Sequence, residues 1–309
     1  MNIVISCDDN YIMPARIMLE SLAAYNTDVS LWIVYSEIQD QNLKKIENDA
    51  DNYKWDFHSI RINDSIRKIA ESLPCNMHFS EEMYYRLFLP WLLPDCERVL
   101  YLDCDILVRG SLSELYDFDL EDNYVGAVHD VNKEIRRESI VRLKLKGDYF
   151  NSGVQLLQLE RIREKMSQEE LLSCIDKISR EFLLIYPDQD ILNKIYEGRI
   201  KEIHKKYNYG AVTSVMHKLK NPEELHNAVV VHFISSNKPW KKEYCLFYLR
   251  EYWSYLQKYI TEEQQSAYWR HKPYVRTWCS IVKGFFLRRL GLRGYTDQLP
   301  SPSENLDNK

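Results

Sequence analysis

The sequence predicts an α/β fold in which helices flank a mostly parallel central sheet. Short apolar runs that are typical of buried strands alternate with helical patterns, and the connections between them are short. Several of the apolar runs end at polar side chains. The chain has 309 residues, of which 45% are hydrophobic, so it can form one large domain or a main domain with a small appendage.

Strands and helices alternate along the first third of the chain. Pro14 marks the first turn of one helix, residues 39–48 form a second, and Ser80 with the two acids after it begins a third. The apolar runs that predict strands are residues 2–7, 29–35, 55–62 and 98–108.

The same alternation continues to about residue 240, where the composition becomes aromatic and basic. Residues 124–129, 150–159 and 228–233 predict strands, and residues 160–179 and 188–197 predict helices. Tyrosines then lie at helical spacing, at Tyr244, Tyr248, Tyr252, Tyr255 and Tyr259. We therefore expect a main domain at residues 1–245, a helical subdomain at 246–295 and a disordered tail at 296–309.

The most informative feature is a pair of acids inside the apolar run 98–108. In an extended strand Asp103 and Asp105 point to the same side, and Cys104 faces away from them. Two carboxylates in a buried strand are costly unless a cation lies beside them. A divalent metal ion is the natural candidate.

Other polar residues fall at the ends of predicted strands. Asp8, Asp105, Asp130 and His232 each follow or end an apolar run. In open α/β sheets, ligands bind beyond the carboxyl ends of the strands. An imidazole beside two carboxylates suits Mn²⁺, which accepts nitrogen as well as oxygen ligands. Lys238 follows His232 closely enough to neutralise diphosphate oxygens.

Each feature also has a structural explanation. The acids of Asp103 and Asp105 could be solvated in a turn, and His232 could be a core histidine. A third reading is an Asp-nucleophile phosphatase of the haloacid dehalogenase type, with Asp103 as the nucleophile. That motif normally follows the first strand of its domain and is accompanied by a later acidic pair, and this chain shows neither feature, so we rank it lower.

Six segments of the chain form a set of motifs, at residues 5–11, 84–87, 101–105, 150–154, 187–190 and 232–240. In this order they resemble the motifs of glycosyltransferase family 8, which includes bacterial lipopolysaccharide galactosyl- and glucosyltransferases and glycogenin. The resemblance covers roughly residues 1–245.

The resemblance implies a GT-A fold and a UDP-sugar donor. Asp8 and Asn10 would bind the uracil and its neighbouring groups, and Tyr11 would stack on the base. Asp103, Asp105 and His232 would hold Mn²⁺ or Mg²⁺. The remaining donor contacts implied by the family are Arg86, Asp103 to the ribose, Asn151 to the sugar, and Lys238 to the diphosphate.

The resemblance also implies transfer with retention of the anomeric configuration. Gln189 occupies the position that a nucleophile would need, and an amide is a poor nucleophile. We therefore predict front-face transfer, in which Gln189 positions the sugar and Asp130 and Asp188 hold sugar hydroxyls. The competing hypothesis from another class is a non-catalytic module that binds a nucleotide sugar or a glycan.

Cysteine usage and charge suggest where the protein acts. The seven cysteines are scattered and odd in number, which favours a reducing compartment, and the N-terminus does not read as a signal peptide. Residues 270–295 carry seven Lys/Arg and no acid, which points to a local anionic partner rather than nucleic acid. We expect residues 268–293 to bind the anionic membrane surface, on the cytoplasmic side, and to bring the enzyme to a lipid-linked acceptor.

Overall fold

The computed structural model describes residues 1–74, 81–210, 222–234, 238–241, 250–262 and 264–265. Some predictions lie outside these residues: the helix start at Ser80, the tyrosines at 244 and 248, and the whole of 268–309. Within the described residues no helix is long and apolar enough to cross a membrane.

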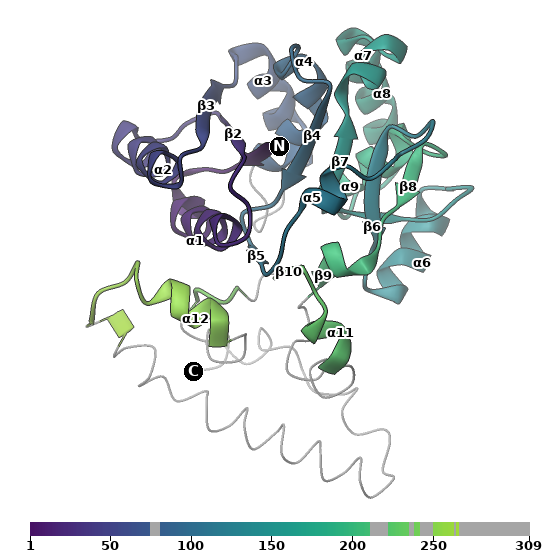
Figure 1. The fold of residues 1–309 in the computed structure, drawn as a ribbon. Helices are drawn as coiled ribbons and strands as arrows, with labels where there is room; N and C mark the ends of the chain where they lie inside the picture. The colour runs from purple at the N-terminus through teal and green to yellow at the C-terminus, as the bar shows by residue number, and fades with distance from the viewer. Residues whose placement is uncertain (75–80, 211–221, 235–237, 242–249, 263, 266–309) are drawn as a thin grey trace, which may run out of the picture.

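A mixed seven-stranded sheet forms the centre of the molecule, with the strand order β3-β2-β1-β4-β7-β6-β8 (Figure 1). All neighbours pair in parallel except for β7, which runs antiparallel to both β4 and β6. The predicted mostly parallel α/β sheet is therefore confirmed. The strands are β1 (Asn2–Ser6), β2 (Ser30–Tyr35), β3 (Asp56–Arg61), β4 (Arg98–Leu102), β6 (Val125–His129), β7 (Phe150–Gln158) and β8 (Ile200–Glu202).

Helices cover both faces of this sheet because alternate side chains of each strand point to opposite faces. Ile3 and Ile5 of β1 pack on one face, against α1 (Ile12–Ala23) and α2 (Asp40–Tyr53). Val4 lies on the other face, which a second group of helices covers. That group comprises α3 (Asp64–Ser72), the 3-10 helix η2 (Glu81–Phe88), α4 (Leu89–Leu92), α7 (Leu159–Lys165), α8 (Gln168–Glu181) and α9 (Pro187–Ile195).

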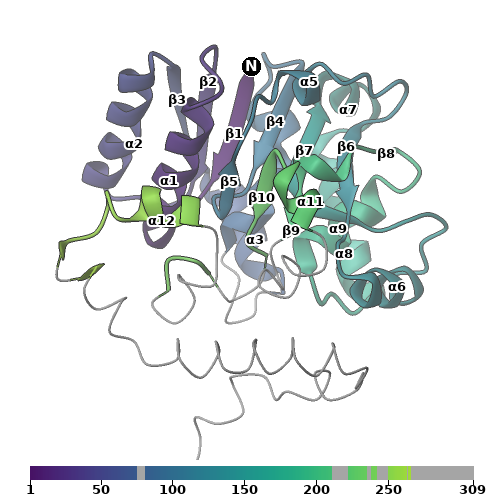
Figure 2. The ribbon, with the colours of Figure 1, turned by 60° about the horizontal axis from the view of Figure 1, so that its bottom comes forward.

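A second, three-stranded sheet lies beside the first, with the order β5-β10-β9 (Figure 2). Its strands are β5 (Ile106–Val108), β9 (Tyr209–Gly210) and β10 (Val230–His232). The helix α12 (Arg250–Leu256) buries Tyr252 and Leu256 in one apolar cluster with Ile17 of α1 and Phe233. Figures 1 and 2 both place α12 next to α1. The remaining short elements are η1 (Asp9–Tyr11), α5 (Ser113–Tyr116), α6 (Lys133–Arg142), η3 (Lys205–Tyr207) and α11 (Pro222–His226).

The structure corrects two predicted elements. The run 98–108 is not one strand: it leaves the large sheet after Leu102 and enters the small sheet at Ile106. The predicted helix 160–179 is two helices, because Ser167 begins a new one. Its hydroxyl accepts from the backbone N–H of Glu170, whose carboxylate accepts from the N–H of Ser167, a complete capping box.

The packing of β6 gives a test of the core. A Cβ added to Gly126 would lie 2.8 Å from Leu120 Cδ2 and 3.1 Å from Ile203 Cγ2. Overpacking of this kind typically destabilises a core by about 1–3 kcal/mol. We predict that Gly126→Ala lowers the free energy of unfolding by that amount in urea denaturation. Gly147→Ala is the control, because a Cβ there meets nothing within 4 Å. Equal stability of the two variants would contradict this account of the core.

Candidate functional site

Polar residues from distant parts of the chain meet at one edge of the central sheet. β1, β4 and β6 run in the same direction, so Asp8, Asp103 and Asp130 follow their carboxyl ends at a common edge. Because β7 runs the opposite way, its first residues, including Asn151, lie at that edge too. His232 is the last residue of β10.

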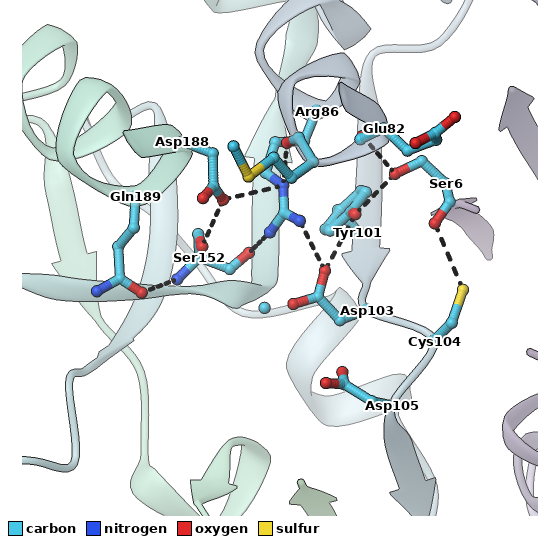
Figure 3. Close-up of polar contacts among 12 residues, drawn as sticks. Ser6, Glu82, Arg86, Tyr101, Asp103, Cys104, Asp105, Ser152, Asp188 and Gln189 are labelled. Carbon is cyan, nitrogen blue, oxygen red and sulfur yellow. Dashed lines mark hydrogen bonds and ion pairs between the residues drawn. The ribbon is translucent and has the colours of Figure 1, made fainter. Parts of the chain in front are cut away.

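The turn at residues 103–105, which we call the acid turn, is held by backbone hydrogen bonds on both sides. The N–H of Asp103 donates to the carbonyl of Gly153 at 2.8 Å, and the N–H of Phe233 donates to the carbonyl of Asp105 at 2.9 Å. The two carboxylates lie on the same side, and the thiol of Cys104 points the other way, toward the carbonyl of Ser6 (Figure 3). The predicted arrangement of the three side chains is thus present, although a turn produces it in place of a strand.

Asp103 is oriented through one of its two oxygens. Oδ1 lies 2.8 Å from Nη2 of Arg86 and accepts from the Tyr101 hydroxyl at 3.1 Å. Oδ2 faces Nε2 of His232 at 3.7 Å. The contacts to Oδ1 therefore fix the direction in which Oδ2 points.

Asp105 lies between His232 and Lys238. The ammonium of Lys238 donates to Oδ2 of Asp105 and, at 2.8 Å, to the carbonyl of Phe233. Oδ1 of Asp105 is buried and accepts no hydrogen bond, although Nε2 of His232 is 3.1 Å away. Burial by itself raises the pKa of Asp105, but Lys238 and His232 together outweigh this effect and hold the pKa below its usual value.

These residues have the composition and geometry of a cation site. One ligand atom from each of Asp103, Asp105 and His232 lies within 4.8 Å of the others. Two carboxylate oxygens and one imidazole nitrogen form a donor set that suits a borderline divalent metal ion. The buried oxygen of Asp105 that lacks a donor is the atom that such an ion would satisfy.

Arg86, from η2, lies buried at the centre of the close-up in Figure 3. Besides Asp103, its guanidinium contacts the carbonyl of Ser152 at 2.7 Å, the carbonyl of Met83 at 2.8 Å and Oδ2 of Asp188 at 3.5 Å. Burial alone lowers the pKa of Arg86, but Asp103 and Asp188 reverse this and raise it. Arg86 therefore holds the carboxylates of Asp103 and Asp188 in place.

Both polar atoms of the Gln189 amide are hydrogen-bonded. Its Oε1 accepts from Nδ2 of Asn151 at 3.0 Å and from the N–H of Ser152 at 3.1 Å. Its Nε2 donates to Oδ2 of Asp130 at 3.0 Å. The neighbouring Asp188 accepts from the hydroxyl of Ser152 at 2.9 Å, and burial raises the pKa of Asp188.

The predicted base-binding loop lies at the same edge. Asp8 caps η1 by accepting from the N–H groups of Asn10 and Tyr11, at 3.0 and 3.1 Å. The ring of Tyr11 packs edge-on against Trp240, with 5.6 Å between the ring centroids. Burial and the charges of Asp105 and Asp103 raise the pKa of the Tyr11 hydroxyl. This loop therefore adjoins the acid turn.

Two features of the site were not anticipated from the sequence. Nδ1 of His232 lies 3.0 Å from Oδ1 of Asn208, a buried residue between η3 and β9. Asp190 accepts from Arg142, from the Tyr149 hydroxyl at 2.6 Å and from the N–H groups just before Pro187, and so anchors the start of α9. Asp190 could have been found from the sequence, because it is the last residue of the motif at 187–190. Nothing in the local pattern singles out Asn208.

Comparisons with known proteins agree with this fold. A galactosyltransferase, LgtC, whose crystal structure was determined with donor and acceptor sugar analogues, superposes with a TM-score of 0.71 at 26% identity. The match covers 86% of this chain and all of that one. The general stress protein A of Bacillus subtilis is 30% identical over 271 residues, which are 83% of this chain and 93% of the relative.

A lipopolysaccharide 1,2-glucosyltransferase of Escherichia coli K12 is 28% identical over 255 residues, covering 78% of this chain and 73% of the relative. The family model for glycosyl transferase family 8 matches residues 2–244. That match takes in all six motifs of the site, from the loop after β1 to Trp240. The fold is thus of the GT-A type, and the chain belongs to glycosyltransferase family 8.

Proposed function

We propose that this protein is a retaining glycosyltransferase that moves a hexose from a UDP-sugar to a saccharide acceptor of lipopolysaccharide or another cell-surface glycan. The observation that carries the proposal is the convergence of Asp103, Asp105 and His232, with Lys238 beside them, at the carboxyl edge of the sheet. The lipopolysaccharide 1,2-glucosyltransferase and the galactosyltransferase among its relatives support a hexose.

The acid turn and Lys238 would handle the charge of the departing UDP. Oδ2 of Asp103, Oδ1 of Asp105 and Nε2 of His232 would hold Mn²⁺ or Mg²⁺. When bound, the ion supplies positive charge for the leaving diphosphate. Lys238 is placed to add its own charge, because its ammonium already lies against Asp105.

The hydrogen bonds of Gln189 support front-face transfer. A double displacement would need a nucleophile on the opposite face of the sugar, and Oε1 of Gln189 is already occupied by Asn151 and the N–H of Ser152. We infer that Gln189 positions the sugar, while Asp130, Asp188 and Asn151 bind its hydroxyls. The acceptor hydroxyl would then pass its proton to the departing phosphate on the same face.

The base would bind on the loop after β1. Asp8 and Asn10 would contact the uracil and Tyr11 would stack on it, next to Trp240. The orientation of this loop is set by the capping bonds of Asp8, so its polar groups are in place before the nucleotide arrives.

We further propose that residues 1–245 form the catalytic domain, 246–295 a helical subdomain and 296–309 a disordered tail. The basic and aromatic segment 268–293 would bind anionic lipid on the inner face of the cell membrane. The support for this part is composition, namely seven Lys/Arg and no acid within 270–295.

The first prediction from the proposed function concerns the acid turn. Asp105→Asn should lower UDP release from the best donor of a UDP-glucose and UDP-galactose panel about 100-fold or more in the presence of Mn²⁺, because the metal and Lys238 lose a shared anion. Asp51→Asn, an exposed acid of α2, is the matched control and should act like wild type.

The same assay separates the competing classes. Near-normal turnover by Asp105→Asn would contradict the assignment of the site. A wild-type protein that binds UDP with Mn²⁺ yet releases no UDP from any donor sugar would be a binding module instead of an enzyme.

The second prediction uses Gly153, whose missing side chain leaves room for the metal ligands. A Cβ on this residue would lie 2.2 Å from Cε1 of His232 and 2.7 Å from Oδ2 of Asp103. Gly153→Ala should therefore displace both ligands and weaken Mn²⁺ binding, measured by titration calorimetry, by at least about tenfold. Gly126→Ala overpacks the core away from the site and controls for stability. Equal Mn²⁺ affinity in the two variants would argue against the ligand set.

The third prediction concerns the basic segment. Replacing Arg288, Arg289 and Arg293 together by Gln should weaken co-sedimentation with anionic vesicles, since each charge near such a surface contributes about 1 kcal/mol. Binding to neutral phosphatidylcholine vesicles should be weak for both proteins. The control replaces exposed Lys45, Lys68 and Lys177. An equal loss in the control, or no binding by the wild type, would contradict the membrane role.

A further inference from the structure

The inference concerns the imidazole of His232, and it rests on the metal site proposed above. A histidine can offer Nε2 to a metal only if that nitrogen carries a lone pair, so the proton of the neutral ring must lie on Nδ1. Nε2 of His232 faces the carboxylates of Asp103 and Asp105, and Nδ1 faces Asn208. The tautomer therefore depends on which atom of the Asn208 amide meets Nδ1.

The hydrogen bonds of Asn208 decide this orientation. Its Nδ2 donates to Oδ1 of Asn151 at 2.7 Å, so its Oδ1 is left to accept from His232 at 3.0 Å. Oδ1 of Asn151 must be an acceptor because the backbone N–H of Gly153, which can only donate, also points to it at 3.0 Å. If the Asn208 amide were reversed, its Oδ1 would face Oδ1 of Asn151, and two acceptors would meet with no donor between them.

The next amide along the chain of hydrogen bonds fixes Asn151 in turn. Nδ2 of Asn151 donates to Oε1 of Gln189, which also accepts from the N–H of Ser152. Nε2 of Gln189 donates to the carboxylate of Asp130. Two backbone N–H groups and one carboxylate thus set the direction of three consecutive amides, and the direction ends at Nδ1 of His232.

Because these side chains are buried, reversing the direction of their hydrogen bonds is energetically costly. Asn208 is 1% exposed, and Asn151, Gln189 and His232 are 4–5% exposed, so bulk water cannot replace a partner that turns away. A buried donor or acceptor left unmatched loses its hydrogen bonds to water without replacing them, which is costly. Reversing a single amide of the chain would create more than one such mismatch.

The surroundings of Nε2 of His232 favour the same tautomer, with the proton on Nδ1. Nε2 of His232 is 3.1 Å from Oδ1 of Asp105, yet that oxygen accepts no hydrogen bond. An Nε2 that carries a lone pair in place of a proton accounts for this missing hydrogen bond. The strand pairing between β9 and β10 keeps the partners together, because Gly210, two residues after Asn208, pairs with His232.

We propose that Asn208 is a positioning residue for the metal ligand. Its Oδ1 keeps the proton of His232 on Nδ1, so that Nε2 presents a lone pair toward Asp103 and Asp105 before any ion binds. The amides of Asn151 and Gln189 connect this ring to Asp130.

The tautomer can be measured without metal or turnover. Wild-type protein labelled with ¹⁵N-histidine is examined by long-range ¹H–¹⁵N correlation at about pH 8, where an ordinary imidazole is neutral. The chain has eight histidines, so His232→Gln identifies the signal of His232 by its loss. The expected result is a single tautomer protonated on Nδ1. A ring protonated on Nε2 in the wild type would overturn the proposal.

Variants of Asn208 test the cause. Asn208→Leu should lose the Nδ1–H tautomer and bind Mn²⁺ roughly 10- to 100-fold more weakly. Asn208→Asp keeps an oxygen toward Nδ1 and should retain the tautomer and part of the affinity. Asn26→Leu is the matched control, since Asn26 is a buried amide whose hydrogen bonds within the described residues go to backbone groups of Leu22, Gly110 and Leu112.

The outcomes separate this inference from the proposed function. An unchanged tautomer in Asn208→Leu, or an equal loss of Mn²⁺ affinity in Asn26→Leu, would overturn the role of Asn208. A wild type that shows the Nδ1–H tautomer but binds no divalent ion would support the positioning of the ring and contradict the metal site instead.

Discussion

The structure depends on how several charged side chains are accommodated at one largely buried edge of the sheet. Asp103, Asp105 and Asp188 bring three carboxylates together, and Arg86 and Lys238 bring two cations. An unpaired buried charge is expensive, so each acid must meet a cation or a hydrogen-bond donor. Arg86 serves two of the acids and Lys238 serves the third. These three acids outnumber their two cations by one, which makes the acid turn attractive to a further cation.

The reversed strand β7 makes this edge possible. In a wholly parallel sheet the start of β7 would lie at the opposite edge, about the length of a strand away. Because β7 runs antiparallel to β4 and β6, Asn151, Ser152 and Gly153 reach the acid turn. Gly153 then supplies the carbonyl that holds Asp103 and the open space that His232 occupies. Topology and the absence of a side chain act together here.

Sequence reasoning located most of the site because its residues follow strand ends, and strand ends are marked by abrupt changes from apolar to polar residues. Asp8, Asp105, Asp130 and His232 all carry that signal. The fold class followed from the alternation of apolar strands with helical patterns, and the family from the resemblance of six motifs. The break between β4 and β5 was missed, because an apolar run looks the same whether it pairs with one sheet or with two. Asn208 was missed because its role arises from a contact with a strand 24 residues away, and nothing in its neighbours announces it.

The distance along the chain between the acid turn and Lys238 has a consequence for synthesis. Lys238 is 133 residues beyond Asp105. At a translation rate of 5–20 residues per second, roughly 7 to 27 seconds pass between the two. During that interval β1, β2 and β4 can pair and Arg86 has already been synthesised, but Asp105 still lacks His232 and Lys238. A nascent chain can therefore form the first strands of its sheet well before the partners of Asp105 exist.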